Sequence, residues 1–334
     1  MQSTGKFNGL TDVEGVLVGN FTDTDAVSGV TVVICPEGAV GAVDVRGAAP
    51  GTRETDLLAP ENLVEKAQAV TLCGGSVYGL AAADGVVRWL SEKGWGFPLD
   101  GRHVAPIVSA ATLYDLGRGS QFVPPISAEW GRLACEAAGS GPVSMGSVGA
   151  GTGALAGGIK SGLGTASLVL DSGITVAALM AVNPAGSVFN PATGRPWEIG
   201  LELGGEFGHR GRRSVRLPAP AAGRPAGNTT IGVVATDAAL TKAQALKVAQ
   251  MSHDGLARAI RPAHTMLDGD TIFCLATGRQ RLPEVPAFYT SPQAHAINDI
   301  GHAAAECTAR AIIHAVLHAT ALAGAATWAD LPER

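Results

Sequence analysis

The sequence predicts an α+β fold in which helices and sheets form a layered sandwich. Strand-like segments follow one another in adjacent pairs, and helical segments separate these groups, unlike the regular alternation of a doubly wound sheet. The clearest pair flanks the turn residues Asp171-Ser172-Gly173, which is the pattern of a hairpin. A long segment with small residues at helical spacing lies near the end of the chain. We treat residues 1–334 as a single domain.

The first half of the chain is expected to be rich in short strands. The segment at 29–35 is dense in β-branched residues, which favour strands. Pro36 is expected to end this strand, because proline has no N–H for a sheet hydrogen bond. The elements predicted here are strands at 29–35, 39–45 and 103–111, a short helix at 62–70, and an Ala-rich helix that ends near residue 93.

The second half combines one hairpin with two further strands and two long helices. Thr241 is a suitable N-cap for the first helix, since its hydroxyl can accept a hydrogen bond from the first turn. In the last helix, a stripe of mostly small residues indicates a buried face: Ile300, Ala304, Cys307 and Ala311. The predicted elements are strands at 165–170, 174–182, 229–235 and 271–276, and helices at 240–260 and 292–322.

Composition argues against several classes of protein. Apolar residues make up 46% of the chain and charged residues 16%, so a large core can form. A net charge of −5 without a basic face argues against nucleic acid as a partner. No segment has the apolar length of a membrane span, and the N-terminus does not resemble a signal peptide. The five cysteines are odd in number and show no CxxC spacing, so we expect buried free thiols and a cytoplasmic location.

A loose segment is predicted at 204–227, where the composition is that of an exposed linker. Its basic residues, at 209–213 and 216, are interpreted as a solvated tether and not as a binding patch. The strand at 229–235 begins directly afterwards. The polar pair Asn228-Thr229 therefore lies between a tether and a buried strand.

We hypothesise that the chain cuts its own peptide bond between Asn228 and Thr229. A threonine hydroxyl is a weak nucleophile and needs a neighbouring base. Cleavage would supply that base, because a free α-amine titrates near ~7.7–8.0; N-terminal threonine is a known variant of the nucleophile–base pair. Two other interpretations are open from the residues alone. Asn228-Thr229-Thr230 fits a glycosylation sequon, although no secretion signal accompanies it, and two threonines are an ordinary strand start.

Two acids are candidates for the same site. Asp268 and Asp270 point to one side of an extended chain, and they introduce a strand that could lie beside the one starting at Thr229. That placement would bring a carboxylate within reach of the Thr229 hydroxyl and ammonium. The alternative is a turn that hydrogen-bonds its own backbone.

Three further polar residues are candidates with equally plain alternatives. Lys160 is the single lysine of a Gly-rich passage, where a substrate could approach closely, but it could be a surface lysine. Asn183 ends a strand before a proline, where its amide could face an oxyanion or simply close a turn. Tyr114 is one of three tyrosines and is ambiguous by itself.

Other motifs match known patterns only in part. The run at 149–154 fits a dinucleotide pattern but does not continue into a helix. Ser76 resembles a hydrolase nucleophile, but Tyr78 stands where that motif needs glycine. His314 and His318 share a helix face without a further ligand, so we predict no metal, and no cofactor.

Five segments in the same order carry a family resemblance over most of the chain: 109–115, 149–151, 182–184, 227–231 and 264–271. Through them the chain resembles the self-cleaving family of D-aminopeptidase/esterase and the β-aminopeptidases. It is most similar to the branch of the endo-type 6-aminohexanoate-oligomer hydrolase, a nylon-oligomer hydrolase. The segments at 227–231 and 264–271 are the specific ones.

The resemblance implies a four-layer α/β/β/α sandwich of the N-terminal-nucleophile-hydrolase kind. It also implies cleavage into fragments of 228 and 106 residues that stay together, in a homo-oligomer that is a tetramer or larger. Thr229 would be the nucleophile, and Asp268 and Asp270 would orient and charge-balance it. The remaining residues that would line the site are Tyr114, Lys160 and Asn183, with Tyr114 and Asn183 placed for the oxyanion.

The expected reaction is amide hydrolysis through a Thr229 acyl-enzyme, on short peptides or linear amide oligomers. Lys160 is the weakest correspondence, because it stands closer to Asn183 in the sequence than the nylon-hydrolase branch leads us to expect. The alternative function is that of a non-catalytic relic that binds amino compounds and never matures.

Overall fold

The computed structural model describes residues 3–218, 228–284 and 291–334. Its centre is a nine-stranded sheet of order β10-β11-β12-β13-β2-β4-β7-β3, with β1 paired to β2 beside this path. The strands are β1 (Leu17–Asp23), β2 (Ser28–Val45), β3 (Gly51–Arg53), β4 (Lys66–Cys73), β5 (Phe97–Pro98), β6 (Val104–Ala105), β7 (Val108–Thr112), β8 (Leu155–Ala156), β9 (Ile159–Lys160), β10 (Leu163–Val169), β11 (Thr175–Asn183), β12 (Thr229–Ala238) and β13 (Thr271–Gln280). The α-helices are α1 (Ala82–Glu92), α2 (Ala128–Glu136), α3 (Lys242–Ala259) and α4 (Ala294–Leu317).

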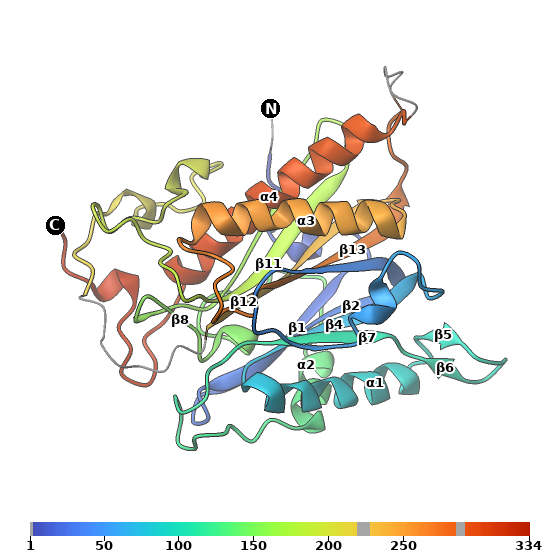
Figure 1. Ribbon diagram of the computed structural model, residues 1–334, viewed down its shortest axis with the longest axis horizontal. Helices are drawn as coiled ribbons and strands as arrows, with labels where there is room; N and C mark the ends of the chain where they lie inside the picture. Colours follow the sequence, from blue (N-terminus) through green and yellow to red (C-terminus); the bar gives the residue numbers. More distant parts are fainter. Residues whose placement is uncertain (1–2, 219–227, 285–290) are drawn as a thin grey trace.

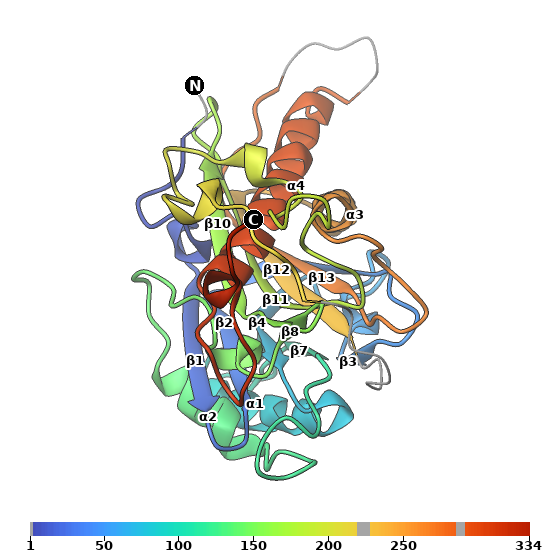
Figure 2. The same ribbon diagram turned by 90° about the vertical axis from the view of Figure 1, so that its left-hand side faces the viewer.

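Helices cover both sides of the sheet (Figures 1 and 2). Helices α3 and α4 pack against β10, β11, β13 and β2, whereas α1 and α2 pack against β1, β2, β4 and β7. One hydrophobic cluster lies beneath each pair of helices, and a third lies between the two halves of the sheet. These three clusters separate four layers, which confirms the predicted α+β sandwich. Both β layers belong to one sheet that folds over on itself.

The long strand β2 joins the two halves of the sheet. The prediction of two strands separated by Pro36 was wrong, because the chain continues through the proline as one strand of 18 residues. Its pairing with β4 shifts between Ile34 and Ala39, and its last part pairs with β13. An irregularity of this kind accommodates the missing N–H of proline, so the strand bends where the sequence predicted an end.

Two other element predictions were also wrong. The helix expected at 62–70 is absent from the described structure, because β4 begins at Lys66 and its residues from Ala67 onward are buried within the sheet. Tertiary burial overrides local helix propensity here. The strand expected at 103–111 is divided into β6 and β7, and the break includes Pro106.

The second half follows the predictions closely. Strands β10 and β11 form the antiparallel hairpin around Asp171-Ser172-Gly173. Thr241 caps α3, with its hydroxyl accepting from the Gln244 N–H and the Gln244 side chain bonding in return. The four residues of the predicted stripe on α4, Ile300, Ala304, Cys307 and Ala311, are all 0% exposed.

The five cysteines are free and buried, as predicted. Burial raises the pKa of the Cys35, Cys274 and Cys307 thiols to about 12. In the described ranges, no helix combines the length and the apolarity needed to cross a bilayer.

Residues 204–218, the described part of the linker predicted at 204–227, contain both exposed and buried positions; 219–227 lie outside the described residues. Phe207 and Val215 are buried, at 4% and 0% exposed. Arg213 forms an ion pair with Glu333 near the C-terminus, and its guanidinium lies over the Trp328 ring. Two of the basic residues therefore attach this segment to the body of the molecule, because the Arg210 and Arg213 guanidinium groups donate to backbone carbonyls of Leu317 and Ala329.

Glu206, in the same segment, is the centre of a buried polar network. It accepts two hydrogen bonds from the Arg310 guanidinium at 2.7 Å each, and one from His314 at 2.9 Å. Burial raises the pKa of Glu206, but these hydrogen bonds outweigh it and lower that pKa to about 2. Arg310 also bonds Asn8, so the network ties the N-terminal segment and residues 204–218 to helix α4.

We predict that Glu206→Gln lowers the free energy of unfolding by about 3–5 kcal/mol, because it leaves the buried Arg310 charge without its partner. Urea denaturation measures this change. The matched control is Glu37→Gln, which removes an exposed pair with Arg279 and should cost no more than about 1 kcal/mol. Equal losses of unfolding free energy in the two variants would show that the buried network stabilises the fold no more than the exposed Glu37–Arg279 pair does.

Candidate active site

Three strands bring the predicted site residues together. Asn183 ends β11 and is the cross-strand partner of Thr229, the first residue of β12. Strand β13 runs parallel to β12, so the segment before β13 lies beside the start of β12. Asn228 forms a bridge with Asp268 in that position. The prediction that the two strands are neighbours is confirmed.

The Thr229 hydroxyl lies against the peptide bond that precedes it. The side chain is almost fully buried, at 4% exposed. Its Oγ donates to the carbonyl oxygen of Asn228 and accepts from the Gly269 N–H at 3.2 Å. A Cβ on residue 269 would approach this Oγ to 3.0 Å and the Ala49 carbonyl to 2.7 Å, so glycine allows the close approach. The hydroxyl is thus held beside one specific carbonyl by a backbone donor.

The two acids are buried and fully engaged by donors. Asp270 accepts from the Thr230 N–H at 2.8 Å, and from the backbone N–H and Nδ1 of His264 at 3.0 and 2.9 Å. Asp268 accepts from the Ala185 N–H at 3.0 Å and from Thr265. In the described residues neither carboxylate bonds the Thr229 hydroxyl directly. Asp270 instead holds the residue next to it.

His264 also lies at the candidate site, and sequence reasoning did not single it out. It is a non-glycine residue in the left-handed region, at φ 54°, and this conformation turns both its N–H and its ring toward Asp270. Its ring packs edge-on against His253, with 4.9 Å between centroids. Burial lowers the pKa of His253 to about 4. The histidine six residues before a predicted acid was visible in the sequence, but only the fold shows that they touch.

Asn183 is completely buried and joins several backbone segments. Its Nδ2 donates to the Tyr114 carbonyl at 3.1 Å, and its Oδ1 accepts from the Leu155 N–H at 3.1 Å and from Arg118 at 2.6 Å. The contact with Tyr114 is therefore made by the tyrosine backbone. An oxyanion role for the two side chains stays a prediction.

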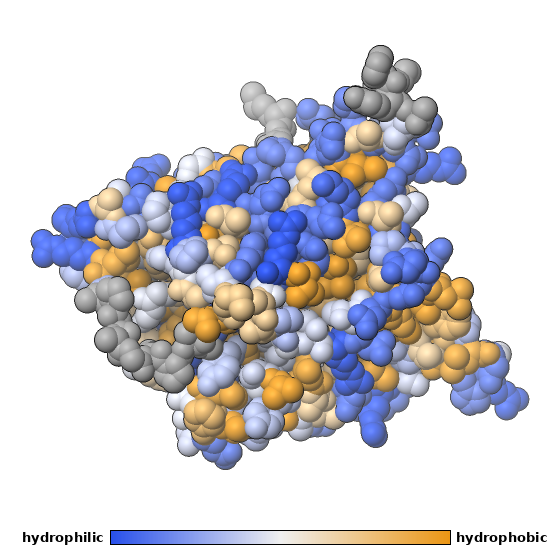
Figure 3. Space-filling model, viewed as in Figure 1, coloured by the Kyte–Doolittle hydropathy of each residue, from blue (hydrophilic) through white to orange (hydrophobic). Residues whose placement is uncertain are grey.

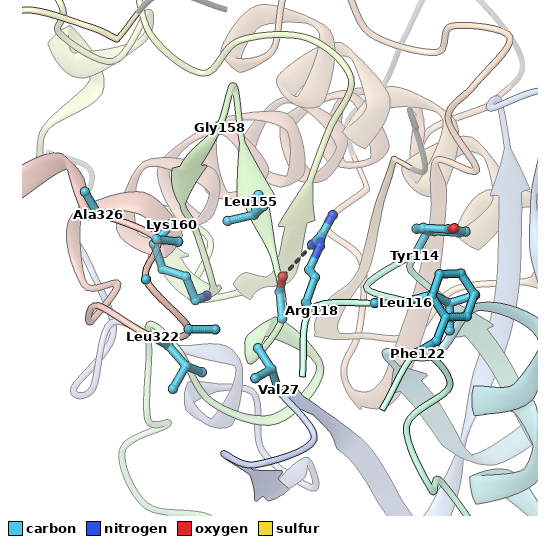
Figure 4. Close-up of a pocket in the computed structure, with 15 residues that line it drawn as sticks. Val27, Tyr114, Leu116, Arg118, Phe122, Leu155, Gly158, Lys160, Leu322 and Ala326 are labelled. Carbon is cyan, nitrogen blue, oxygen red and sulfur yellow. Dashed lines mark hydrogen bonds between the residues drawn. The ribbon is translucent and has the colours of Figure 1, made fainter. Parts of the chain in front are cut away.

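A cavity of about 470 Å³ contains Tyr114, Arg118 and Lys160 in its wall. Figure 4 shows Arg118 between the other two, with Tyr114 beside Leu116 and Phe122. Arg118 donates to the Gly153 carbonyl as well as to Asn183. No motif pointed to Arg118, because its role depends on a loop that reaches the site only in the folded chain.

Lys160 is not a surface lysine. It is 1% exposed, and its ammonium donates to the carbonyls of Gly151, Ala154 and Ser161 at 3.2, 3.1 and 2.5 Å. Burial lowers the pKa of Lys160 to about 7, with Arg118 acting in the same direction and Asp115 opposing it. Through the Gly151 and Ala154 carbonyls, Lys160 holds the loop that precedes Leu155, and Leu155 in turn contacts Asn183. Lys160 does not touch Thr229 in the described structure.

We predict that Lys160 makes stability depend on pH above 7. Between pH 7 and about 10 the unfolded chain carries the proton and the folded chain does not, so stability rises with pH, by at most about 1.4 kcal/mol per unit. Below pH 7 both states are charged and the slope vanishes. Urea unfolding at pH 7, 8 and 9 should show this slope with Lys160 and not in Lys160→Met, both measured with Thr229→Ala so that cleavage plays no part. Identical slopes would mean that Lys160 keeps its charge.

A second cavity, of about 680 Å³, adjoins the first. The two share Arg118, Leu155 and Gly158 in their walls, and the second also includes Asn228. The carbonyl beside the Thr229 hydroxyl therefore belongs to a residue that borders an open space large enough for a small substrate.

The remaining motifs lie outside this site. Gly149–Gly151 form a short 3-10 turn and not the start of an α-helix. Ser76 begins another 3-10 segment, at Ser76–Ala81. His314 bonds Glu206, and no group of three or more histidine, cysteine or acidic residues in the described ranges is placed to hold a metal ion.

Comparisons with known proteins give one consistent result. Residues 8–328 match the model of peptidase family S58. An uncharacterized aminopeptidase of Mycobacterium tuberculosis is 50% identical, over 97% of this chain and 98% of its own. The 6-aminohexanoate-oligomer endohydrolase of a Kocuria species is 32% identical, over 86% of this chain and 79% of its own.

Solved structures agree with these sequence matches. A Burkholderia β-aminopeptidase superposes with a TM-score of 0.72 at 26% identity, covering 97% of this chain and 91% of its own. The L-aminopeptidase D-Ala-esterase/amidase of Ochrobactrum anthropi, described as a variant of the Ntn hydrolase fold, gives 0.70 at 22% identity, covering 95% and 88%. The second likeness concerns the fold alone.

Proposed function

The chain belongs to peptidase family S58 and is a hydrolase of amide or peptide bonds, and from this premise we propose that it cuts itself between Asn228 and Thr229 and then uses Thr229 as its nucleophile. The observation that carries the proposal is the position of the Thr229 hydroxyl, which donates to the Asn228 carbonyl and accepts from the Gly269 N–H.

Self-cleavage proceeds in two steps in this proposal. The Thr229 Oγ attacks the carbonyl carbon of Asn228, the C–N bond breaks, and the released nitrogen takes up the proton, leaving an ester. Water then attacks the ester, so that Asn228 ends in a carboxylate and Thr229 regains its hydroxyl and gains a free α-amine. In the first step, the Gly269 N–H holds Oγ beside the Asn228 carbonyl and favours loss of the hydroxyl proton.

Turnover uses the new amine as the base. The amine takes the proton of the Thr229 hydroxyl, Oγ attacks the substrate amide, the substrate's amine leaves with that proton, and water releases the acyl group. In the proposal Asp270 keeps the start of β12 in register and balances the new ammonium, with Asp268 beside it. Asn183 and Tyr114 stabilise the oxyanion, and Lys160 supports the loop behind Asn183.

Candidate substrates are short peptides and linear amide oligomers, since relatives are named as aminopeptidases and as 6-aminohexanoate-oligomer endohydrolases. Mass spectrometry of purified protein tests the first step: we expect two chains, of 228 and 106 residues, the shorter beginning with Thr229. A single intact chain in a sample that is active would refute the mechanism. An intact chain in an inactive sample would favour the non-catalytic relic.

We also propose that copies of the cleaved protein form a homo-oligomer in the cytoplasm. Several large apolar side chains are exposed, among them Leu63 at 88%, Met266 at 80% and Leu99 at 63%. Figure 3 shows apolar surface near the β5-β6 hairpin of Figure 1. Contiguous apolar surface, such as that near this hairpin, is typical of interfaces between protein chains. Light scattering that gives the mass of one 33.7 kDa chain would contradict the assembly.

A further inference from the structure

His264 has a backbone conformation that is uncommon for any residue with a Cβ. Its φ of 54° lies in the left-handed region. Such a conformation persists only where the surrounding contacts hold it, and it is concentrated at functional sites. At His264 these contacts are two hydrogen bonds to one carboxylate: the backbone N–H and Nδ1 reach Asp270 at 3.0 and 2.9 Å. The unusual backbone therefore serves the contact with Asp270.

The two oxygens of Asp270 have separate tasks. Oδ1 accepts from the Thr230 N–H at 2.8 Å, and Oδ2 accepts both hydrogen bonds from His264. A carboxylate is a rigid planar group, so donors at Oδ2 fix the direction in which Oδ1 points. His264 thus determines how Asp270 holds the residue that follows Thr229.

The hydrogen bond from the ring requires a proton on Nδ1. Three N–H groups reach Asp270, so its oxygens act as acceptors and the imidazole nitrogen that contacts them must donate. The other ring nitrogen, Nε2, is buried and has no hydrogen-bond partner in the part of the chain that the structure describes. A proton on Nε2 would lack an acceptor, which costs free energy. The form with its proton on Nδ1 satisfies both ring nitrogens best.

His253 holds the His264 ring in place. The two rings meet at 68°, with 4.9 Å between centroids. His253 is 0% exposed, and its Nε2 donates to the Asp44 carbonyl at 3.0 Å, which fixes the ring to β2 beside β13. Burial lowers the pKa of His253 to about 4, so at neutral pH this ring brings no positive charge near Asp270. The imidazole of His264 is therefore preorganised as a donor to Asp270.

We propose that His264 is a positioning residue for both self-cleavage and turnover, because its Nδ1–H fixes the carboxylate of Asp270 that holds the start of β12. This inference rests on the proposed function and deepens it, since Asp270 balances the Thr229 ammonium there. The wall of neither cavity described above includes His264. It acts through Asp270 and not on the substrate.

Two variants separate the donor from the bulk of the ring. His264→Gly adopts the same φ without strain and has no side-chain donor. His264→Asn also tolerates this φ, and it places an amide N–H close to the position of Nδ1 while removing the ring. We expect kcat on an aminoacyl anilide to fall about tenfold in His264→Gly, the size of one hydrogen bond to a charged group. His264→Asn should recover most of this loss, and KM should stay the same in both variants.

The matched control is His103→Gly. His103 makes the same pair of contacts, from its backbone N–H and its Nδ1 to Asp100, but its ring is 72% exposed. Self-cleavage and kcat should be unchanged in this control. Turnover is expressed per cleaved chain, counted on denaturing gels, and thermal transitions show that each variant is folded. No loss in His264→Gly, or an equal loss in His264→Gly and His264→Asn, would overturn the inference and leave the proposed function intact.

The proton on Nδ1 is tested independently of activity. In Thr229→Ala protein with ¹⁵N-labelled histidine rings, the His264 signals are those that disappear when His264→Asn is added. We expect their ¹⁵N shifts at pH 7 to show a protonated Nδ1. An unprotonated Nδ1 would overturn the inference even where the native chain cuts itself. A native chain that stays intact and inactive would overturn the proposed function first, and this inference with it.

Discussion

Thr229→Ala is expected to remain one chain of 334 residues and to have no measurable amide hydrolysis. The change removes the single oxygen that lies against the Asn228 carbonyl, so neither the ester nor the acyl-enzyme can form. Removal of a nucleophile lowers the rate by about 10³-fold or more. Intact-mass spectrometry and an anilide assay on the same sample measure both effects.

The matched variant is Thr229→Ser, which keeps a hydroxyl and, after cleavage, an α-amine. It should split at the same bond and retain hydrolysis, because the chemistry needs the oxygen and not the methyl group. A Thr229→Ala protein that still splits, or that still hydrolyses the anilide, would remove Thr229 from the mechanism. Failure of both variants to fold would be seen in their thermal transitions, since the methyl group and hydroxyl are both buried.

Asp270→Asn is expected to slow both maturation and turnover by about 10²-fold, the effect of losing one well-placed electrostatic partner. The carboxylate receives three N–H donors, from Thr230 and from His264. An amide of the same shape has one acceptor oxygen and places its own N–H groups against one of these donors. The start of β12 would shift, and the new Thr229 ammonium would lose a compensating charge.

Asp237→Asn is the control for Asp270→Asn. Asp237 is also a buried acid on β12 and accepts the Thr175 N–H at 2.9 Å, but it lies far along the strand from Thr229. We expect it to mature and to turn over normally. Time courses of cleavage on denaturing gels, with rates on an anilide, compare the two. Unchanged rates in Asp270→Asn would remove Asp270 from the site.

Several features could be predicted because they are local. The capping box of α3 needs only Thr241 and Gln244 three residues later, and the β10-β11 hairpin needs only its turn and its alternating flanks. The predicted cleavage position at Asn228-Thr229 was visible as a polar pair before a β-branched run. The family resemblance added the expectation that this pair and the Asp268-Gly269-Asp270 turn belong to the same site.

The errors came from residues whose environment is set by distant parts of the chain. Of the helix expected at 62–70, the part from Lys66 onward is strand β4, because it pairs with β2 and β7, which local propensity does not record. Within the exposed linker predicted at 204–227, one contact could not be foreseen: Glu206 pairs with Arg310, about a hundred positions later. A Gly-rich segment with charged residues has the composition of a linker whether or not its charged side chains form ion pairs with distant residues.

By itself, the sequence determined which candidate side chains are available for the predicted chemistry: a threonine hydroxyl, two acids, an asparagine, a lysine and a tyrosine, because those identities are chemical properties of side chains. The tertiary structure decided what each of them touches, since contact depends on how strands pair. Only the parallel pairing of β12 with β13 brings the Gly269 N–H to the Thr229 hydroxyl, and only packing buries Lys160. Distances between residues 40 or more positions apart are set by the fold, and the electrostatics of the site follow from those distances.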